Sequence, residues 1–128
     1  MLKPSLTTGL PLLLWWTAMF VFTSLPGEPP GPPAWLDNAD KLGHAGMFWA
    51  LGVLLLRWVL VRSGGRAPWA VIVAMIVGAA YGALDELHQQ YIVYRSCDVF
   101  DWLADVAGLA AGCCTVLWER ARGHWHVA

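Results

Sequence analysis

The sequence predicts an all-α membrane protein in which four helices cross the bilayer as a compact bundle. Of its 128 residues, 58% are hydrophobic and only 13% are charged, whereas a soluble globular chain carries about 25% charged residues. It contains four apolar stretches that are long enough to cross a bilayer as helices. These stretches lack the alternation of apolar and polar residues that is typical of membrane barrel strands.

The four predicted spans share a length of about 20 residues, which matches the thickness of the hydrocarbon core. They are Leu6–Leu25, Leu42–Val61, Pro68–Leu87 and Val99–Trp118. The first contains no charge, and its apolar run is too long for a cleaved secretory signal, so we expect it to be retained. Between the first two spans, the proline-rich stretch Pro26–Ala39 is expected to be an extended loop.

The basic residues predict the orientation of the spans. One side of the membrane receives Lys3, Arg57, Arg62, Arg66, Arg120 and Arg122, whereas the other receives Lys41 and Arg95. The positive-inside rule assigns the first group to the cytoplasm, so both termini are expected there.

Charge and cysteine content exclude several classes of protein. Eight Lys and Arg against nine Asp and Glu give a formal net charge of −1, and there are three cysteines. There is no basic excess to bind nucleic acid, and an apolar chain with so few cysteines is not a disulfide scaffold. We expect a single domain over residues 1–128.

Polar residues recur at helical spacing near the outer ends of the last two spans. The third span carries Gly78, Gly82, Asp85 and Gln89, and the fourth carries Asp98, Asp101, Asp105, Gly108 and Gly112. Each set follows a seven-residue repeat and therefore lies on one helix face. Each set also includes a G-x-x-x-G pair, which lets helix backbones approach closely.

A hairpin between these spans predicts which residues face each other. The expected pairs are Gly82 with Gly108, Gly78 with Gly112, Asp85 with Asp105 and Gln89 with Asp101. In the second span, His44 follows Asp40 by one helical turn and can face the same cluster. The predicted polar pocket consists of Asp40, Lys41, His44, Asp85, Glu86, Gln89, Arg95, Asp101 and Asp105.

Carboxylates that meet in a low-dielectric site must share a proton, take up a cation or pair with a base. The available bases are Arg95, Lys41 and His44. A purely structural alternative is that Arg95 and Lys41 neutralise the acids, and that the cluster only locks the outer ends of three helices.

Several short motifs, in order along nearly the whole chain, resemble the VanZ-like family of bacterial membrane proteins. They are Thr23-Ser24-Leu25-Pro26-Gly27, Asp40-Lys41-x-x-His44, Asp85-Glu86-Leu87-His88-Gln89 and the stretch holding Arg95, Asp101, Asp105, Gly108 and Gly112. The chain departs from the family pattern at Asp105, where Asn is common, and at Tyr94, where a glycine usually precedes the arginine. The resemblance implies a bacterial inner-membrane protein, linked in some members to resistance to glycopeptide antibiotics such as teicoplanin.

Three functions are compatible with these features. The favoured one is a non-enzymatic module with an outward-facing polar pocket that binds membrane lipids. The ligand would be a lipid head group, a lipid-linked cell-wall precursor or a lipophilic antibiotic, and Lys41 and Arg95 would contact its phosphate.

The second is an interfacial enzyme acting on a lipid-linked substrate, with His44 or a carboxylate as base and Arg95 steadying an oxyanion. In one variant a divalent cation is held by His44, Asp85, Glu86 and Asp101; no other cofactor is expected.

The third function, an ion pathway, ranks last, because the polar residues stop in the outer half of the spans. The sequence contains no familiar catalytic motif, and its G-x-x-x-G pairs leave open whether the chain forms a dimer.

Overall fold

The structure, a computed structural model, describes residues 4–29 and 35–126. Within these residues it consists of four α-helices and no strand. The helices are α1 (Pro4–Thr23), α2 (Trp35–Arg62), α3 (Ala67–Gln89) and α4 (Val99–Ala121). All four are long and apolar enough to cross a membrane, which confirms the predicted fold class. Lys3 and residues 30–34 of the proline-rich stretch lie outside the described residues.

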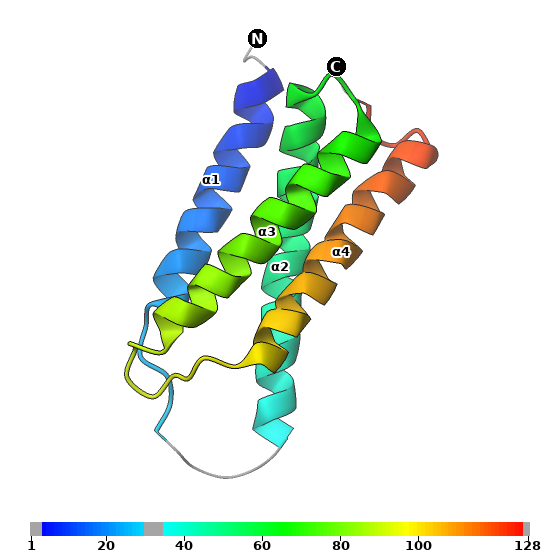
Figure 1. The fold of residues 1–128 in the computed structure, drawn as a ribbon. Helices are drawn as coiled ribbons and strands as arrows, with labels where there is room; N and C mark the ends of the chain where they lie inside the picture. The colour runs from blue at the N-terminus through cyan, green and yellow to red at the C-terminus, as the bar shows by residue number, and fades with distance from the viewer. Residues whose placement is uncertain (1–3, 30–34, 127–128) are drawn as a thin grey trace.

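Successive helices run in opposite directions, so α1 begins and α4 ends at the same end of the bundle (Figure 1). We call this the terminal end, and we call the opposite end, where α1 and α3 finish and α4 begins, the acidic end. Helix α2 contacts all three other helices and packs most extensively against α4. The weakest contact is between α1 and α3.

Helix α2 is longer than the predicted span. It begins at Trp35, seven residues before Leu42, so the expectation that the extended loop continues to Ala39 is wrong for its last residues. Hydropathy ends a span at the first charged residues, but backbone hydrogen bonds of a helix continue wherever the backbone can adopt helical angles. The added turns extend the helix beyond the apolar core at the acidic end.

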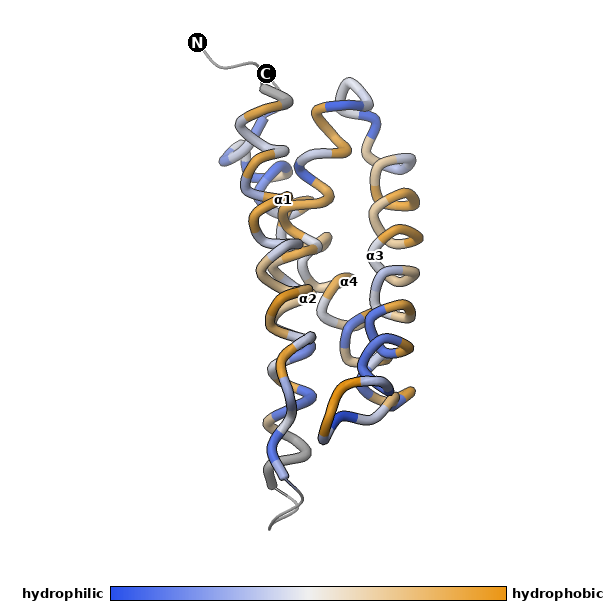
Figure 2. Tube along the Cα trace, turned by 90° about the vertical axis from the view of Figure 1, so that its left-hand side faces the viewer, coloured by the Kyte–Doolittle hydropathy of each residue, from blue (hydrophilic) through white to orange (hydrophobic). Residues whose placement is uncertain are grey.

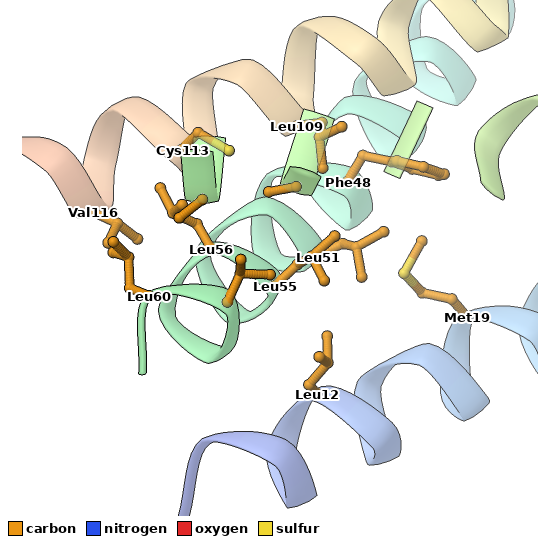
Figure 3. Packing of buried hydrophobic residues seen from close by; sticks show 13 residues of the cluster. Leu12, Met19, Phe48, Leu51, Leu55, Leu56, Leu60, Leu109, Cys113 and Val116 are labelled. Atoms are coloured by element: carbon orange, nitrogen blue, oxygen red, sulfur yellow. The ribbon is translucent and has the colours of Figure 1, made fainter. Parts of the chain in front are cut away.

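The apolar core lies around α2. Figure 3 shows Leu56 and Leu60 of α2 pointing toward α4, which contributes Cys113 and Val116. From the opposite side, Leu12 of α1 points toward α2 (Figure 3). Because lipid is as apolar as these side chains, their contribution comes from close packing more than from removal of apolar surface from water.

Most of the remaining apolar surface faces outward. The windows that qualify as membrane spans are only 17–44% buried inside the bundle. Figure 2 shows hydrophobic residues along the middle of the helices and hydrophilic ones toward the ends. A water-soluble protein would cover such a surface, whereas a bilayer solvates it.

Three glycines bring α2 and α4 into backbone contact. A Cβ atom added to Gly108 would overlap the carbonyl oxygen of Ala45, and one added to Gly112 would overlap that of Trp49. On α2, a Cβ atom added to Gly52 would overlap the carbonyl oxygen of Leu109. No side chain fits at these positions, and small residues are the usual means of such close approach in membranes.

This contact corrects the predicted pairing of glycines. Gly108 and Gly112 pack against α2, not against Gly82 and Gly78 of α3. On α3, a Cβ atom at Gly82 would meet Asp105 and one at Gly78 would meet Leu109, each three residues before the predicted partner. A G-x-x-x-G pair predicts that some backbone will approach, but it does not identify which helix supplies that backbone.

The loops at the acidic end are joined at Gly27, whose N–H donates to the carbonyl oxygen of Val93 at 2.9 Å. Tyr94, which follows Val93 in the chain, adopts a φ of 59°. This left-handed conformation costs a residue with a Cβ atom about 1–2 kcal/mol. A glycine usually stands here in the family that the sequence resembles.

We therefore expect Tyr94→Gly to stabilise the protein by about 1 kcal/mol, because it removes this steric cost from an exposed side chain. Tyr94→Ala keeps the Cβ atom and should give no gain. Thermal unfolding in detergent measures both, and equal midpoints for the two variants would contradict the account.

We expect Gly108→Ala to destabilise the protein by about 1–3 kcal/mol, because α2 and α4 must separate to admit the methyl group. Gly46→Ala is the matched control, since a Cβ atom at this helical glycine meets nothing within 4 Å. The two variants can be compared by denaturant titration in micelles. A Gly108→Ala variant as stable as Gly46→Ala would show that the helices are not in backbone contact.

Candidate functional site

His44, Glu86 and Asp105 meet in the interior of the acidic end, and we call them the buried triad. They come from α2, α3 and α4, and their exposed fractions are 2%, 2% and 0%. The Nδ1 atom of His44 lies 2.9 Å from Oδ1 of Asp105 and 3.8 Å from Oε1 of Glu86. The group is therefore an imidazole held between two carboxyl groups and closed to solvent.

Helix packing accounts for the position of the triad. Ala45, which touches Gly108, directly follows His44 in sequence, so the backbone contact between α2 and α4 also brings His44 to Asp105. On the other side, Gly82 leaves room for the second oxygen of Asp105, which lies 3.2 Å from where a Cβ atom of residue 82 would be.

Glu86 is oriented by the start of α4. Its Oε2 atom accepts a hydrogen bond from the backbone N–H of Asp98 at 2.9 Å. The side chain of Asp98 in turn caps α4 by accepting from the N–H of Phe100 at 2.8 Å. The end of α3 and the start of α4 are thus fixed to each other, and Oε1 of Glu86 is left to face His44.

Lys41 neutralises the outer acids of the cluster. Its Nζ atom lies 3.1 Å from Asp101 and 3.5 Å from Asp98. Asp101 is buried, whereas Asp40 is exposed at the start of the same region. This part of the acidic end agrees with the purely structural alternative, but Lys41 forms no ion pair with the triad carboxylates.

Asp85 makes its hydrogen bonds away from the triad. It accepts from the hydroxyl of Thr23 at 2.7 Å and from the side-chain amide of Gln89 at 3.0 Å. Asp85 is thus bonded to α1 and within its own helix, and it still lies close enough to Asp105 for the two carboxyl groups to interact electrostatically. The contact with Thr23 was not predicted from the sequence, although Thr23 begins the first motif that resembles the family.

Arg95 is also separate from the triad. Its Nε atom donates to the carbonyl oxygen of Leu25 at 3.0 Å, and its guanidinium lies 6.0 Å from the centre of the Phe22 ring. No carboxylate among the residues that the structure describes forms an ion pair with it. The structural alternative, in which Arg95 neutralises the acids, therefore does not hold for this residue.

A serine and a histidine meet beside this loop. The Oγ atom of Ser24 lies 3.2 Å from Nε2 of His88, whose ring stacks on Phe20. The Ser24 hydroxyl also donates to the carbonyl oxygen of Phe20 at 2.6 Å. Because a hydroxyl has one proton, Ser24 does not donate to His88 while it donates to Phe20. In this arrangement His88 is not a base that activates the serine.

Two groups of side chains have the spacing of metal ligands. In the buried triad, one potential ligand atom from each residue lies within 4.8 Å of the others, and the same holds for Asp40, His44 and Asp101. Three of these residues, His44, Glu86 and Asp101, were predicted from the sequence as ligands of a divalent cation. The fourth predicted ligand, Asp85, belongs to neither group, whereas Asp105 and Asp40 were not predicted.

The terminal end holds a different set of charges. Arg57 of α2 donates to Glu119 of α4, and Arg120 donates to the carbonyl oxygen of Gly65 at 3.0 Å. Arg57 is therefore part of a cross-link between α2 and α4. It also lines a cleft of about 220 Å³ together with Leu54 and Trp125.

The comparison with known families agrees with the motif resemblance. The sequence model of the VanZ/LLP1 family matches residues 7–119. This range includes all four helices almost completely, and all residues of the buried triad. No curated protein and no solved structure matches the chain.

We expect Thr23→Val to destabilise the protein by about 1–3 kcal/mol, because buried Asp85 then loses a hydrogen-bond donor. Thr17→Val is the matched control, since that exposed hydroxyl bonds only to the carbonyl oxygen of Leu13 within its own helix. The midpoints of thermal unfolding in micelles should differ. Equal effects of both substitutions would rule out the α1–α3 hydrogen bond.

Proposed function

The chain belongs to the VanZ/LLP1 family, and from this premise we propose that it binds the phosphate-bearing head group of a lipid at the acidic end of its bundle. The protein is a multi-pass membrane protein. The observation that carries the proposal is the charge of Arg95, which has no carboxylate partner among the described residues and lies beside exposed apolar side chains.

The distribution of basic residues supports an orientation with the acidic end outside. Arginines 57, 62, 66, 120 and 122 belong to the terminal end, whereas Lys41 and Arg95 are the basic residues of the described acidic end. By the positive-inside rule, the terminal end lies on the cytoplasmic side of a bacterial cell membrane. The lipid head group is then recognised on the outer face.

Arg95 is better suited to phosphate than Lys41. The ammonium of Lys41 is already shared between Asp98 and Asp101. Arg95 uses only Nε in a hydrogen bond, to the neutral carbonyl of Leu25, so its terminal N–H groups are available. A guanidinium presents these groups as a planar fork, which matches two phosphate oxygens.

The surroundings of Arg95 suit the apolar part of a lipid. Phe22, whose ring centre lies 6.0 Å from the guanidinium, is more than half exposed, as are Val93 and Tyr94, which directly precede Arg95. Aromatic and aliphatic side chains at this level contact acyl chains and the interface. Arg95 and these side chains together offer one charge and one apolar surface to a single amphiphile.

Within this proposal, the bound lipid is a phosphate-bearing, lipid-linked precursor of the cell envelope. Holding such a precursor at the outer surface affects its availability to antibiotics that bind it. A contribution to resistance against glycopeptides such as teicoplanin follows from that function.

An interfacial enzyme is the second candidate, favoured by the contact between Ser24 and His88 beside Arg95. It ranks below lipid binding because the hydroxyl proton of Ser24 is donated to the carbonyl oxygen of Phe20. A nucleophilic serine must instead donate that proton to its base.

We expect Arg95→Gln to weaken binding of a polyprenyl monophosphate about 10-fold or more, since one charge-assisted contact contributes about 1.5–3 kcal/mol. Arg122→Gln, at the terminal end, is the matched control and should bind like the wild type. Native mass spectrometry of the detergent-solubilised chain measures both.

Phosphatidylglycerol and phosphatidylcholine serve as comparison lipids in the same assay. Because both of these lipids also carry phosphate, the unphosphorylated polyprenol is measured beside them. Equal loss for the polyprenyl phosphate and the polyprenol would indicate damage to the fold, whereas loss confined to the phosphate-bearing lipids indicates loss of phosphate recognition. Unchanged binding of the polyprenyl phosphate by Arg95→Gln would refute the proposal.

A further inference from the structure

We propose that His44, Glu86 and Asp105 bind one divalent transition-metal ion, of the Zn²⁺ class, between α2, α3 and α4. The potential ligand atoms of these three residues lie within 4.8 Å of one another, and all three side chains are almost completely buried. This site is distinct from the lipid site, which lies at the exposed loop of Arg95, and neither depends on the other.

Two buried oxygen atoms indicate that the triad is incomplete without a further ligand. Oε1 of Glu86 and Oδ2 of Asp105 have no hydrogen-bond partner. Oε1 of Glu86 is directed at His44, 3.8 Å from its Nδ1 atom, and the other oxygen of Glu86 is held by the N–H of Asp98. A buried acceptor without a partner is costly, and native proteins leave few of them.

The charges of the triad also favour a bound divalent cation. With both carboxyl groups ionised and the imidazole neutral, the triad would carry a charge of −2, which a low-dielectric interior does not accept without compensation. Lys41 and Arg95 form no ion pair with these carboxylates among the described contacts. One divalent cation neutralises the triad completely, whereas protonation of His44 alone leaves a net negative charge.

The spacing and chemistry of the donors favour zinc or a similar ion. A tetrahedral Zn²⁺ ion with bonds of about 2.0–2.2 Å separates its ligand atoms by about 3.4 Å. The observed separations from Nδ1 of His44, 2.9 Å to Asp105 and 3.8 Å to Glu86, lie on either side of this value. One imidazole nitrogen with two carboxylates suits Zn²⁺, whereas Ca²⁺ and Mg²⁺ prefer oxygen ligands alone.

The second group of potential ligands provides a route to the buried site. Asp40, Asp101 and His44 also have ligand atoms within 4.8 Å of one another. Asp40 is exposed and Asp101 is nearly buried, so the acids lead from the surface of the acidic end to the imidazole that both groups share. Lys41 lies 3.1 Å from Asp101 on this path, so an entering cation competes with its ammonium group for that carboxylate.

The test uses the full chain in detergent micelles, stripped with a chelator and dialysed against Zn²⁺. We expect one Zn²⁺ per chain by elemental mass spectrometry. Glu86→Gln and Asp105→Asn should each weaken the affinity about 100-fold or more, because an amide is a poor ligand for this ion. Asp85→Asn, a change at a buried carboxylate outside the triad, should retain the metal and is the matched control.

Cobalt substitution gives a readout that does not depend on the stability of the variants. Co²⁺ bound to the wild type should show the visible absorption of a tetrahedral site with nitrogen and oxygen ligands, and excess Zn²⁺ should displace it. Absence of a stoichiometric metal in the wild type overturns the proposal. Equal loss of metal in Asp85→Asn and Asp105→Asn overturns it as well.

Discussion

The backbone contact between α2 and α4 is the constraint on which the rest of the structure depends. Gly52, Gly108 and Gly112 each lie so close to a carbonyl group of the other helix that no side chain fits. The same contact brings His44 next to Asp105, because the residue that touches Gly108 is the immediate neighbour of His44. A membrane provides no hydrophobic force between helices, so close packing and interhelical polar contacts must determine which helices pair. In this protein, close packing and a polar contact both join α2 to α4.

The acidic end divides into a closed part and an exposed part. The buried triad is shut off from solvent, and the proposed divalent cation would neutralise it. The loop of Arg95 lies outside, is joined to the residues after α1, and keeps an uncompensated positive charge among exposed apolar side chains. Lys41 lies between the two parts and is neutralised by Asp98 and Asp101. Ion binding and lipid binding are therefore assigned to different residues, which can be changed separately.

Much of the fold could be predicted from the sequence, whereas the partners within the site could not. Four apolar stretches identified the four helices because a bilayer admits few other structures. The seven-residue repeat placed Asp101, Asp105, Gly108 and Gly112 on one face, and the structure buries all four. That repeat does not identify the neighbouring helix, so Gly108 was assigned to α3 instead of α2. The contact of Thr23 with Asp85 joins residues far apart in sequence, and no local pattern predicts it.

The most direct test of this account is the coupling between His44 and Asp105 in a double-mutant cycle. The unfolding free energies of His44→Gln, Asp105→Asn and the double variant are measured in micelles containing a chelator. If the contact of α2 with α4 holds the two side chains 2.9 Å apart, the effects are non-additive by about 1–3 kcal/mol. Additive effects would mean that the two residues do not touch, and the arrangement of the helices described above would be incorrect.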